Sequence, residues 1–565
     1  MSLSRCIIKE TNHLKPKYIY FFEHNMYRFL QYICIDIRFF YFIIYRRKLL
    51  GGDPVLAKVN TVSLYGLEPH IVTVEADVSN GIPAFDIVGL PEAAVRESRE
   101  RVKAALKNAG FVFPAKRIIV NLAPADLKKN GTGFDLPIAV ALLAATEQIA
   151  SEVIGSHMYF LGELSLDGSV SAVNGVLPMA GGICRRDEEA VIFVPAANAK
   201  EAALNGEGTV YAVDSLSQLE ALLTGTETAE PICSTEEDFA PETADSGGYI
   251  DMKDIKGQSL VKRGMEIAAA GGHNVLLIGV PGSGKTLLAR SFPTILPPLS
   301  RKEALEVTSV HSLAGELGDD YLVRKRPFRA PHHTSSAVSL TGGGIYPKPG
   351  EISLALHGVL FLDEIVEFPK NVLQVLRQPL EDKTVHISRA SGTCTFPADF
   401  QLIAACNPCP CGYYGDPEKE CTCSEHQVSR YFNKLGGPLM DRLDIHMNVA
   451  RVTFSELHNE SEEESSAEIR SRVLKARALQ RQRYEALEIE CNAGLDRRYL
   501  GEFCSLDKEA AASLKRVFDR LCLSARGHDR ILKVARTIAD LSGEKDISSD
   551  HILEAVRYRT LDRIG

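Results

Sequence analysis

The fold of this chain is decided by the stretch Gly279-Val280-Pro281-Gly282-Ser283-Gly284-Lys285-Thr286. It fits the phosphate-loop pattern G-x-x-x-x-G-K-[ST] at every fixed position, between an apolar run that predicts a strand and a segment that predicts a helix start. Glycines in such a loop let backbone N–H groups surround phosphate oxygens, while Lys285 reaches the outer phosphates and Thr286 offers its hydroxyl to Mg²⁺. A purely structural glycine turn would not need the Lys-Thr ending. The stretch therefore predicts a site for ATP and Mg²⁺.

A second motif supplies carboxylates for the same site. The stretch Gly358-Val359-Leu360-Phe361-Leu362-Asp363-Glu364 is an apolar run that ends in two acidic residues, as a Walker B strand does. We expect Asp363 to hold the Mg²⁺ shell and Glu364 to polarise the attacking water. A metal ligand paired with a water-activating carboxylate favours hydrolysis over storage of the nucleotide.

Length and composition limit the number of domains, the kinds of partner and the compartment that we expect for this chain. The chain has 565 residues, enough for several domains with their own cores, and a formal net charge of −9. A surface that is acidic overall does not attract nucleic acid, so any contact with DNA must come from a local basic feature. The 13 cysteines, without a secretory leader pattern, are typical of a reducing compartment, so we expect a cytoplasmic protein.

The first 54 residues differ from the rest of the chain. Their longest uncharged aromatic run, Phe39–Tyr45, has seven residues, far short of the ~20 that span a bilayer, so we expect no stable membrane insertion. A helix on a membrane surface is the alternative. Gly51–Pro54 can be encoded as a ribosome-binding sequence before a start codon at Val55. We predict that residues 1–54 are an extension introduced by gene prediction, or are disordered; the intact mass of the native protein tests this.

Periodicity divides the rest of the chain into four parts. Residues 55–223 alternate strand-like and helix-like segments, and residues 224–248 have the Glu-, Thr-, Pro- and Ser-rich composition of a flexible acidic linker. Residues 249–450 contain both nucleotide motifs, and residues 451–565 carry helical periodicity. The predicted fold is multidomain α/β, with an N-terminal α+β domain, a central phosphate-loop α/β core and a C-terminal all-α lid.

The central part resembles the AAA+ ATPases at several fixed places. The stretch from Asp251 to Gln258 resembles their adenine-pocket box, and the nucleotide contacts that this implies are Asp254, Ile255, Gly257 and Gln258. Asn407, at the end of an apolar strand, resembles the sensor-1 residue that orients the attacking water.

The same resemblance implies roles for three arginines. Arg442, within Gly437–Asp444, resembles the arginine finger that reaches the triphosphate of a neighbouring subunit and neutralises charge in the transition state. Arg526 opens a C-terminal helix in the manner of sensor 2, which implies contact with the γ-phosphate, with Arg530 as second choice. A finger supplied by a neighbour implies a homo-oligomer, expected to be a hexameric ring.

Further motifs in the core indicate which branch of the AAA+ ATPases the chain resembles. Pro331–Ser336, Gly342–Gly344 and Pro349–Glu351 resemble the helix-2 insert of the magnesium-chelatase-like branch, and Pro379–Ala390 with the strand after it resembles its presensor-1 hairpin. With the N-terminal region, the resemblance covers Val55 to Ile564. The chain is identified as a member of the ComM/YifB family of magnesium-chelatase-like AAA+ ATPases.

The N-terminal domain is similar to the proteolytic domain of Lon proteases, a ribosomal S5 domain 2-like fold. The similarity covers Asn121–Gly131, the helix after it and Gly162–Gly168. The Lon pattern places its nucleophilic serine where this chain has Gly133, and its lysine near Leu177. Without a nucleophile and an activating amine there is no covalent route, so we expect an inactive domain used in assembly or substrate handling. Thr132 is the one substitute nucleophile.

Four cysteines form two close pairs. Cys409 and Cys411 are followed after nine residues by Cys421 and Cys423, which is the ligand set of a structural Zn²⁺ site. Unliganded reduced thiols or an iron–sulfur cluster are the alternatives, and Cys406 or His426 could compete as ligands. The cluster lies between Asn407 and Arg442, so a metal here could stiffen the loop that places the finger.

The family resemblance also implies a substrate, because its transformation-linked members act on branched DNA by helicase or branch-migration activity. Local phosphate contacts could come from Lys383, His386 and Arg389 on the hairpin and from Lys348 on the insert. We therefore expect a DNA motor acting on branched or single-stranded DNA. One alternative is an ATP-driven protein remodeller. The other is the motor subunit of a magnesium chelatase, and the Lon-like N-terminal domain argues against this second alternative.

Overall fold

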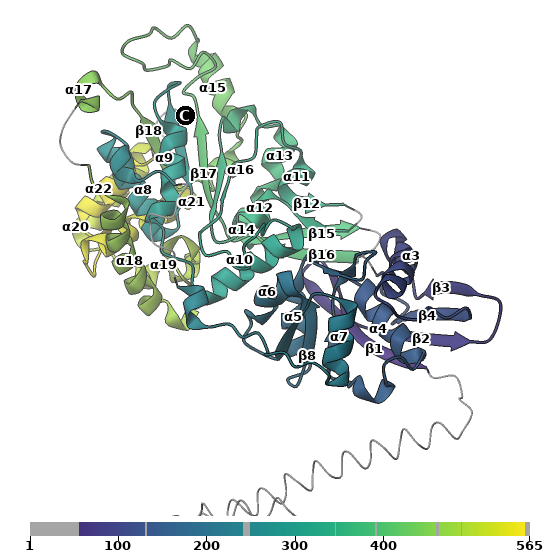
Figure 1. Cartoon of the computed structure of the whole chain (residues 1–565). Helices are drawn as coiled ribbons and strands as arrows, with labels where there is room; N and C mark the ends of the chain where they lie inside the picture. Colours follow the sequence, from purple (N-terminus) through teal and green to yellow (C-terminus); the bar gives the residue numbers. More distant parts are fainter. Residues whose placement is uncertain are drawn as a thin grey trace, which may run out of the picture.

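The computed structural model describes residues 56–129, 131, 133–240, 249–344, 346–389, 392–458, 463–487, 489–521 and 523–559. The predicted extension, residues 1–54, lies outside them. Figure 1 shows an N-terminal domain beside a central α/β core, and the C-terminal helices on the other side of that core. The fold class predicted from the sequence is confirmed.

The N-terminal domain is built on a seven-stranded mixed sheet in the order β3-β4-β2-β1-β5-β8-β9. Its strands are β1 (Ala57–Tyr65), β2 (Glu68–Ser79), β3 (Ala84–Val88), β4 (Arg117–Ala123), β5 (Met158–Phe160), β8 (Val191–Pro195) and β9 (Thr209–Val213), with a small hairpin of β6 (Glu163–Leu164) and β7 (Val170–Ser171). Its helices are α3 (Ala93–Asn108), α4 (Asp135–Ala145), α5 (Val176–Cys184), α6 (Ala199–Ala203) and α7 (Leu216–Thr224). The apolar α4 is buried on all sides because β1 and β2 cover one face and α3 another.

The central core is a five-stranded parallel sheet in the order β11-β14-β17-β10-β18. Its strands are β10 (Val275–Gly279), β11 (Phe328–Arg329), β14 (Val359–Leu362), β17 (Gln401–Cys406) and β18 (Ile445–Val449). Strands covered on both faces are apolar at nearly every position. Val275 and Leu277 pack with the lid, whereas Leu276 and Ile278 pack in the cluster on the opposite face. Because the strands are parallel, their carboxyl ends lie at one edge.

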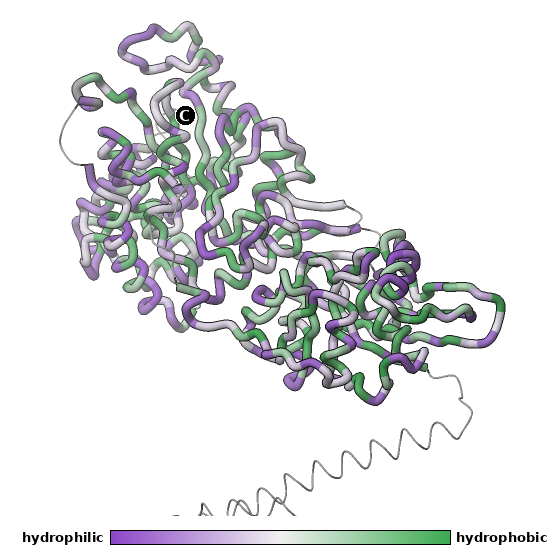
Figure 2. The backbone as a smooth tube through the Cα atoms, in the orientation of Figure 1, coloured by the Kyte–Doolittle hydropathy of each residue, from purple (hydrophilic) through white to green (hydrophobic). Residues whose placement is uncertain are grey.

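Helices and two hairpins surround this sheet. The helices are α8 (Ser259–Gly271), α9 (Lys285–Ser291), α10 (Arg301–Ala314), α11 (Ala337–Thr341), α12 (Glu351–Leu354), α13 (Lys370–Val375), α14 (Arg377–Asp382), α15 (Glu425–Asn433) and α16 (Gly437–Met440). The hairpins are β12 (Gly342–Gly343) with β13 (Lys348–Pro349), and β15 (Thr384–Arg389) with β16 (Gly392–Pro397). They coincide with the insert and the hairpin predicted from the sequence. Figure 2 shows mostly hydrophobic backbone along the central strands and hydrophilic stretches on the outer helices.

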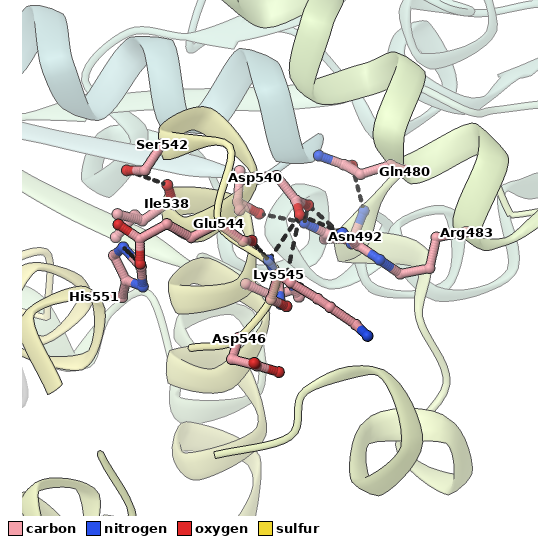
Figure 3. Close-up of polar contacts among 12 residues, drawn as sticks. Gln480, Arg483, Asn492, Ile538, Asp540, Ser542, Glu544, Lys545, Asp546 and His551 are labelled. Carbon is pink, nitrogen blue, oxygen red and sulfur yellow. Dashed lines mark hydrogen bonds and ion pairs between the residues drawn. The ribbon is translucent and has the colours of Figure 1, made fainter. Parts of the chain in front are cut away.

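The C-terminal part is helical, as its periodicity predicted. Its helices are α17 (Phe454–Leu457), α18 (Ser466–Arg483), α19 (Leu500–Phe503), α20 (Lys508–Leu521), α21 (Ala525–Ser542) and α22 (Ser549–Arg557). A buried carboxylate joins three of its segments (Figure 3): Asp540 accepts hydrogen bonds from Arg483, from Arg536 at 3.1 Å and from Asn492 at 2.9 Å. A buried charge is tolerable only when it is paired and hydrogen-bonded in this way, so the network fixes how α18 and α21 pack.

The N-terminal domain is joined to the core by a buried polar contact. The hydroxyl of Ser312, near the end of α10, donates to Glu201 of α6 and accepts the backbone N–H of Gly175 at 2.9 Å. Burial raises the pKa of the Glu201 carboxyl. A second contact lies at the β15–β16 hairpin, where Cys394 and Gly392 pack against the turn between β1 and β2.

The acidic linker is partly docked. A short 3-10 helix, Glu236–Phe239, is capped by Thr235 and packs on the core. The Asp238 carboxylate accepts the Tyr321 hydroxyl at 2.7 Å, and Arg301 lies over the Phe239 ring. This stretch of the predicted linker therefore contacts the core, because an aromatic ring and two acidic side chains find partners there. Residues 241–248 lie outside the described residues.

Within the described part of the chain, no helix combines the length and the apolar character needed to cross a membrane.

Replacing Ser312 with Ala tests the domain junction. The change removes one of three hydrogen bonds to the buried Glu201 carboxyl, which keeps those from Leu177 and Asn198. It also removes the hydroxyl that accepts the Gly175 N–H, so the free energy of unfolding should fall by about 1–3 kcal/mol. The matched control is Ser309→Ala on the same helix, where the hydroxyl donates to Leu305 at 2.8 Å and loss should cost less than about 0.5 kcal/mol. Denaturant unfolding followed by circular dichroism measures both; equal shifts would contradict the assignment.

Candidate nucleotide site

The phosphate loop lies where the sequence predicted it, between β10 and α9. Gly282 and Gly284 have φ values of +79° and +91°, a region that glycine occupies without strain. Gly279 packs so closely that an added Cβ would lie 2.5 Å from the Val449 carbonyl oxygen of β18. The strand pairing and the loop geometry therefore depend on each other at this glycine.

Lys285 is nearly buried and is held by the loop itself. Its Nζ donates to the Gly279 carbonyl at 2.6 Å and to the Val280 carbonyl at 3.1 Å, and it lies 3.3 Å from Asn407 Oδ1. Burial lowers the pKa of this amine, while the nearby Asp363 opposes that shift. Phosphate oxygens at the loop would give the ammonium group charged partners in place of carbonyls, and charge-assisted hydrogen bonds are the stronger kind.

The predicted magnesium ligands meet at the carboxyl edge of the sheet. Thr286 Oγ1 donates to Asp363 Oδ2 at 2.8 Å, although the two are 77 residues apart in sequence. The other oxygen, Oδ1, accepts the Glu364 N–H at 2.9 Å and is thereby oriented. A hydroxyl and a carboxylate are hard oxygen ligands of the kind Mg²⁺ takes beside nucleotide phosphates, so the residues present fit that ion.

The Glu364 carboxylate has a neighbour that the sequence did not indicate. Glu364 has a φ of +50° and a side chain that is 54% exposed, and its Oε2 lies 3.5 Å from His333 Nδ1. His333 follows β11, the edge strand of the same sheet, and was interpreted only as part of the insert. Because about half of the Glu364 side chain is exposed, a water molecule can reach its carboxylate.

The predicted sensor and adenine residues lie on either side of the loop. Asn407 directly follows β17, which pairs with β10, and this places its amide beside Lys285. On the other side, Gln258 donates to the Ala450 carbonyl at 2.5 Å, just after β18. Ile255 is buried, the Gly257 N–H donates to Glu463, and Asp254 is exposed. The contacts of these residues with nucleotide and water remain predictions.

Arg442 lies at the opposite edge of the sheet from the phosphate loop. Its backbone carbonyl accepts from Asn274, the residue before β10, and its guanidinium pairs with Glu381 of α14. Five residues of strand separate this edge from the loop, which is about 16 Å. Arg442 therefore does not reach the phosphate loop of its own chain.

Arg526 and Arg530 lie beside Arg442. Arg526 pairs with Asp441 at 3.2 Å, and Arg530 donates to the Leu443 carbonyl at 3.3 Å. A cavity of about 620 Å³ opens next to them between the core and the lid, and the phosphate loop does not line it. Its cationic lining residues are Arg326, Lys383, Arg442, Arg477, Arg481, Arg530 and Lys533. The arginines predicted to contact phosphate thus form one group, away from their own loop.

The four predicted cysteine ligands are brought together. Their sulfur atoms all lie within 4.8 Å of one another, with Cys409 Sγ 3.3 Å from Cys411 Sγ and 3.7 Å from Cys421 Sγ. Cys423 completes this group, which includes neither Cys406 nor His426. Backbone N–H groups lower the pKa of Cys411 to about 5, whereas burial raises the pKa of Cys406 to about 12. Thiolates are the form of cysteine that binds metals.

The two residues predicted to contact DNA differ in position. Lys383 lies at the base of the β15–β16 hairpin, where it pairs with Asp399 at 2.8 Å. Arg389 lies at the tip, is exposed, and has its guanidinium beside Gly343 of the β12–β13 hairpin. His386 bonds to Thr395 across its own hairpin at 2.9 Å.

The Lon-like part contains no assembled catalytic pair among the described residues. Leu177 is a buried aliphatic residue of α5, and Gly133 offers no side chain. Thr132 lies outside the described residues. The buried Lys129 donates to the Pro124 carbonyl, and burial lowers its pKa.

Fold and site together define a phosphate-loop ATPase of the AAA+ class, and family comparisons agree. The profile described as magnesium chelatase, subunit ChlI, matches residues 251–457, and its C-terminal counterpart matches residues 463–559. A profile described as subunit ChlI of Mg-chelatase matches residues 74–198. This last match removes the expectation that the N-terminal domain argues against the chelatase pattern.

The chain belongs to the ComM/YifB family of magnesium-chelatase-like AAA+ proteins. It is 43% identical over 511 residues to the uncharacterized protein YifB of Salmonella typhimurium, covering 90% of this chain and 98% of the relative. It is 42% identical over 510 residues to Competence protein ComM of Haemophilus influenzae, with the same coverage of both chains. It is 42% identical over 514 residues to YifB of Escherichia coli, again covering 90% and 98%.

Replacing Glu364 with Gln tests its assignment as the water-activating group. The amide cannot accept a proton, so ATP turnover should fall by about 10²- to 10⁴-fold while ATP binding is kept. The matched control is Glu367→Gln, three residues along, whose carboxylate faces Lys434 at 3.9 Å. Turnover and equilibrium binding of a fluorescent ATP analogue are measured on both variants. Equal loss of turnover in the two, or loss of binding in Glu364→Gln, would contradict the role.

Proposed function

We propose that this protein is a ring-forming motor that couples Mg²⁺-dependent ATP hydrolysis to translocation or branch migration of DNA. The observation that carries the proposal is the tip of the β15–β16 hairpin, where Arg389 is exposed beside the β12–β13 hairpin and its exposed Lys348. Two hairpins that present cations side by side on an acidic protein form a local basic feature, which contact with phosphates requires.

The position of the arginines supports the proposed ring. Arg442 is about 16 Å from the phosphate loop of its own chain, the length of the five-residue strand β10. A finger must touch the transferred phosphoryl group to act on it, so the phosphate loop that Arg442 serves belongs to a neighbouring copy. Arg526 and Arg530 lie on the same edge and would face the same triphosphate. Repeating this head-to-tail contact generates a ring, expected to be a hexamer.

The cysteine cluster fits Zn²⁺. Tetrahedral Zn–S bonds of about 2.3 Å require sulfur atoms about 3.8 Å apart. The measured separations of 3.3, 3.6 and 3.7 Å among Cys409, Cys411 and Cys421 are close to this spacing. Four thiolates around one cation make a closed site with no open position, which is the structural kind of zinc site.

A second function has a specific observation in its favour. The three matching profiles carry the name of a magnesium chelatase subunit, which suggests a motor that powers metal insertion through a partner protein. The name of the Haemophilus influenzae relative, Competence protein ComM, favours the first proposal, and that relative matches along nearly its whole length.

Mixing two inactive variants tests the ring. Lys285→Ala removes a residue of the chain's own site, and Arg442→Ala removes the finger, so each alone should lose at least about 10³-fold in turnover. In mixed rings an intact Lys285 site can face an intact Arg442, so part of the activity should return. Lys285→Ala mixed with Asp363→Asn is the control, because both defects lie in the same site. Absence of recovery in the first mixture, once subunit exchange is verified, would contradict a finger supplied by a neighbour.

DNA dependence of turnover tests the substrate. ATP hydrolysis is measured with single-stranded, forked and four-way-junction DNA at several salt concentrations, with Lys285→Ala as the blank. Branched DNA should stimulate turnover. Arg389→Ala should weaken DNA binding and lower its salt slope by about one, whereas Arg389→Lys keeps the charge and most of the stimulation. If no DNA changes the rate of ATP hydrolysis but a polypeptide does, the result would favour a protein remodeller. If neither changes the rate, the result would favour a chelatase motor subunit whose partner protein is missing from the assay.

A further inference from the structure

We infer that the cysteine loop, residues 408–423, forms a wall of the nucleotide site, so that metal bound to its thiolates raises the affinity for ATP. The inference rests on the proposed metal site and on the ATP site, and not on the proposed DNA substrate. Three contacts carry it, one each to the phosphate loop, the sensor strand and the adenine side.

The first contact joins the loop to the phosphate loop. Gly412 lies between the cysteine ligands, and a Cβ added to it would meet both Cδ and Cγ of Pro281 at 3.1 Å. Pro281 is the third residue of the phosphate loop, and its ring therefore rests on the backbone of the cysteine loop. The Gly412 N–H also donates to the Cys409 carbonyl at 3.0 Å, which ties this contact to the first ligand.

The second link is covalent, because the first cysteine ligand closely follows the sensor strand in the chain. Cys409 is only two residues after Asn407, and the residue is 1% exposed. Asn407 in turn lies 3.3 Å from the Lys285 ammonium group. A metal that fixes Cys409 therefore also restricts the residue predicted to orient the attacking water.

The third contact reaches the adenine side. Arg451 pairs with Asp416 at 3.3 Å and with Glu418 at 2.8 Å, two carboxylates of the cysteine loop. Arg451 directly follows Ala450, whose carbonyl accepts the Gln258 side chain. The cysteine loop therefore also touches the strand end against which the predicted adenine residue is held.

These contacts make metal and nucleotide binding interdependent. A segment of 16 residues with little regular structure has large conformational entropy, and a four-thiolate site removes much of it at one point. Restricting the loop in the conformation that contacts Pro281, Asn407 and Arg451 lowers the entropy lost when ATP orders the same residues. Such coupling is reciprocal, so ATP must tighten metal binding by the same factor that metal tightens ATP binding.

The test measures equilibrium binding of a fluorescent ATP analogue with Mg²⁺ to the full chain, without DNA and without turnover. Metal content is measured by mass spectrometry, before and after chelation and after Zn²⁺ is added back. Chelated protein should bind the analogue about 5- to 150-fold more weakly, the usual range of coupling, and recover on addition of Zn²⁺. Unchanged affinity after verified metal loss would overturn the inference, as would failure of the thiols to bind Zn²⁺.

Two glycine variants separate contact from general damage to the loop. Gly412 and Gly415 have φ values of +88° and +78°, so Ala is strained at both. Only Gly412 lies against Pro281, because a Cβ at Gly415 would meet nothing within 4 Å. Gly412→Ala should weaken ATP binding with its metal content unchanged, and Gly415→Ala should weaken it less, because the backbone strain is common to both variants and the Pro281 contact is not. Equal ATP affinity in the two variants would overturn the wall contact, whatever the protein does with DNA.

Discussion

The nucleotide site depends on one constraint, the parallel pairing of β10 between β17 and β18. The registers Ile278 with Cys406 and Gly279 with Val449 bring three strand ends to the same level. Parallel strands expose their carboxyl ends at one edge, and ligands in open α/β sheets bind there. These registers place the ends of the three strands side by side, so the phosphate loop lies next to both Asn407 and Ala450. A shift of one residue along β10 would separate the lysine from its asparagine.

The same pairing creates a second functional edge. The amino ends of β10 and β18 meet at Asn274, which holds the Arg442 carbonyl. One parallel sheet thus presents the phosphate loop at one edge and a cluster of arginines at the other. In the proposed ring, the arginine edge of one copy would face the phosphate-loop edge of the next, a head-to-tail contact that closes when the rotation allows it.

The sequence predicted those parts of the site that are local or that lie at strand ends. The phosphate loop, the Asp363–Glu364 pair and Asn407 each follow an apolar run, so a strand and its terminus could be predicted together. The cysteine group was predicted from spacing, but the exclusion of Cys406 was not, because it depends on the positions of the sulfur atoms in space and Cys406 is held at the end of β17. His333 beside Glu364, and Gly412 on Pro281, are contacts between segments 31 and 131 residues apart. Nothing in the local pattern of either partner indicates such a contact, since it depends on how inserts fold back over the sheet.

The pairing of Arg442 with Glu381 suggests how a site could influence the hairpin in the proposed ring. Glu381 lies in α14, which leads through Lys383 directly into β15, the strand that ends at Arg389. The planar guanidinium has a limited set of donors, and a triphosphate is a more highly charged partner for them than a single carboxylate. If the phosphate of a neighbour bound Arg442 in the proposed ring, Glu381 would share that guanidinium, and the contact of α14 with Arg442 would weaken. The base of the hairpin would then be held by the Lys383–Asp399 pair and no longer through α14, while Cys394 stays packed on the turn between β1 and β2. The N-terminal domain would therefore act as the fixed side of a hinge, a role that needs a retained fold but no protease chemistry.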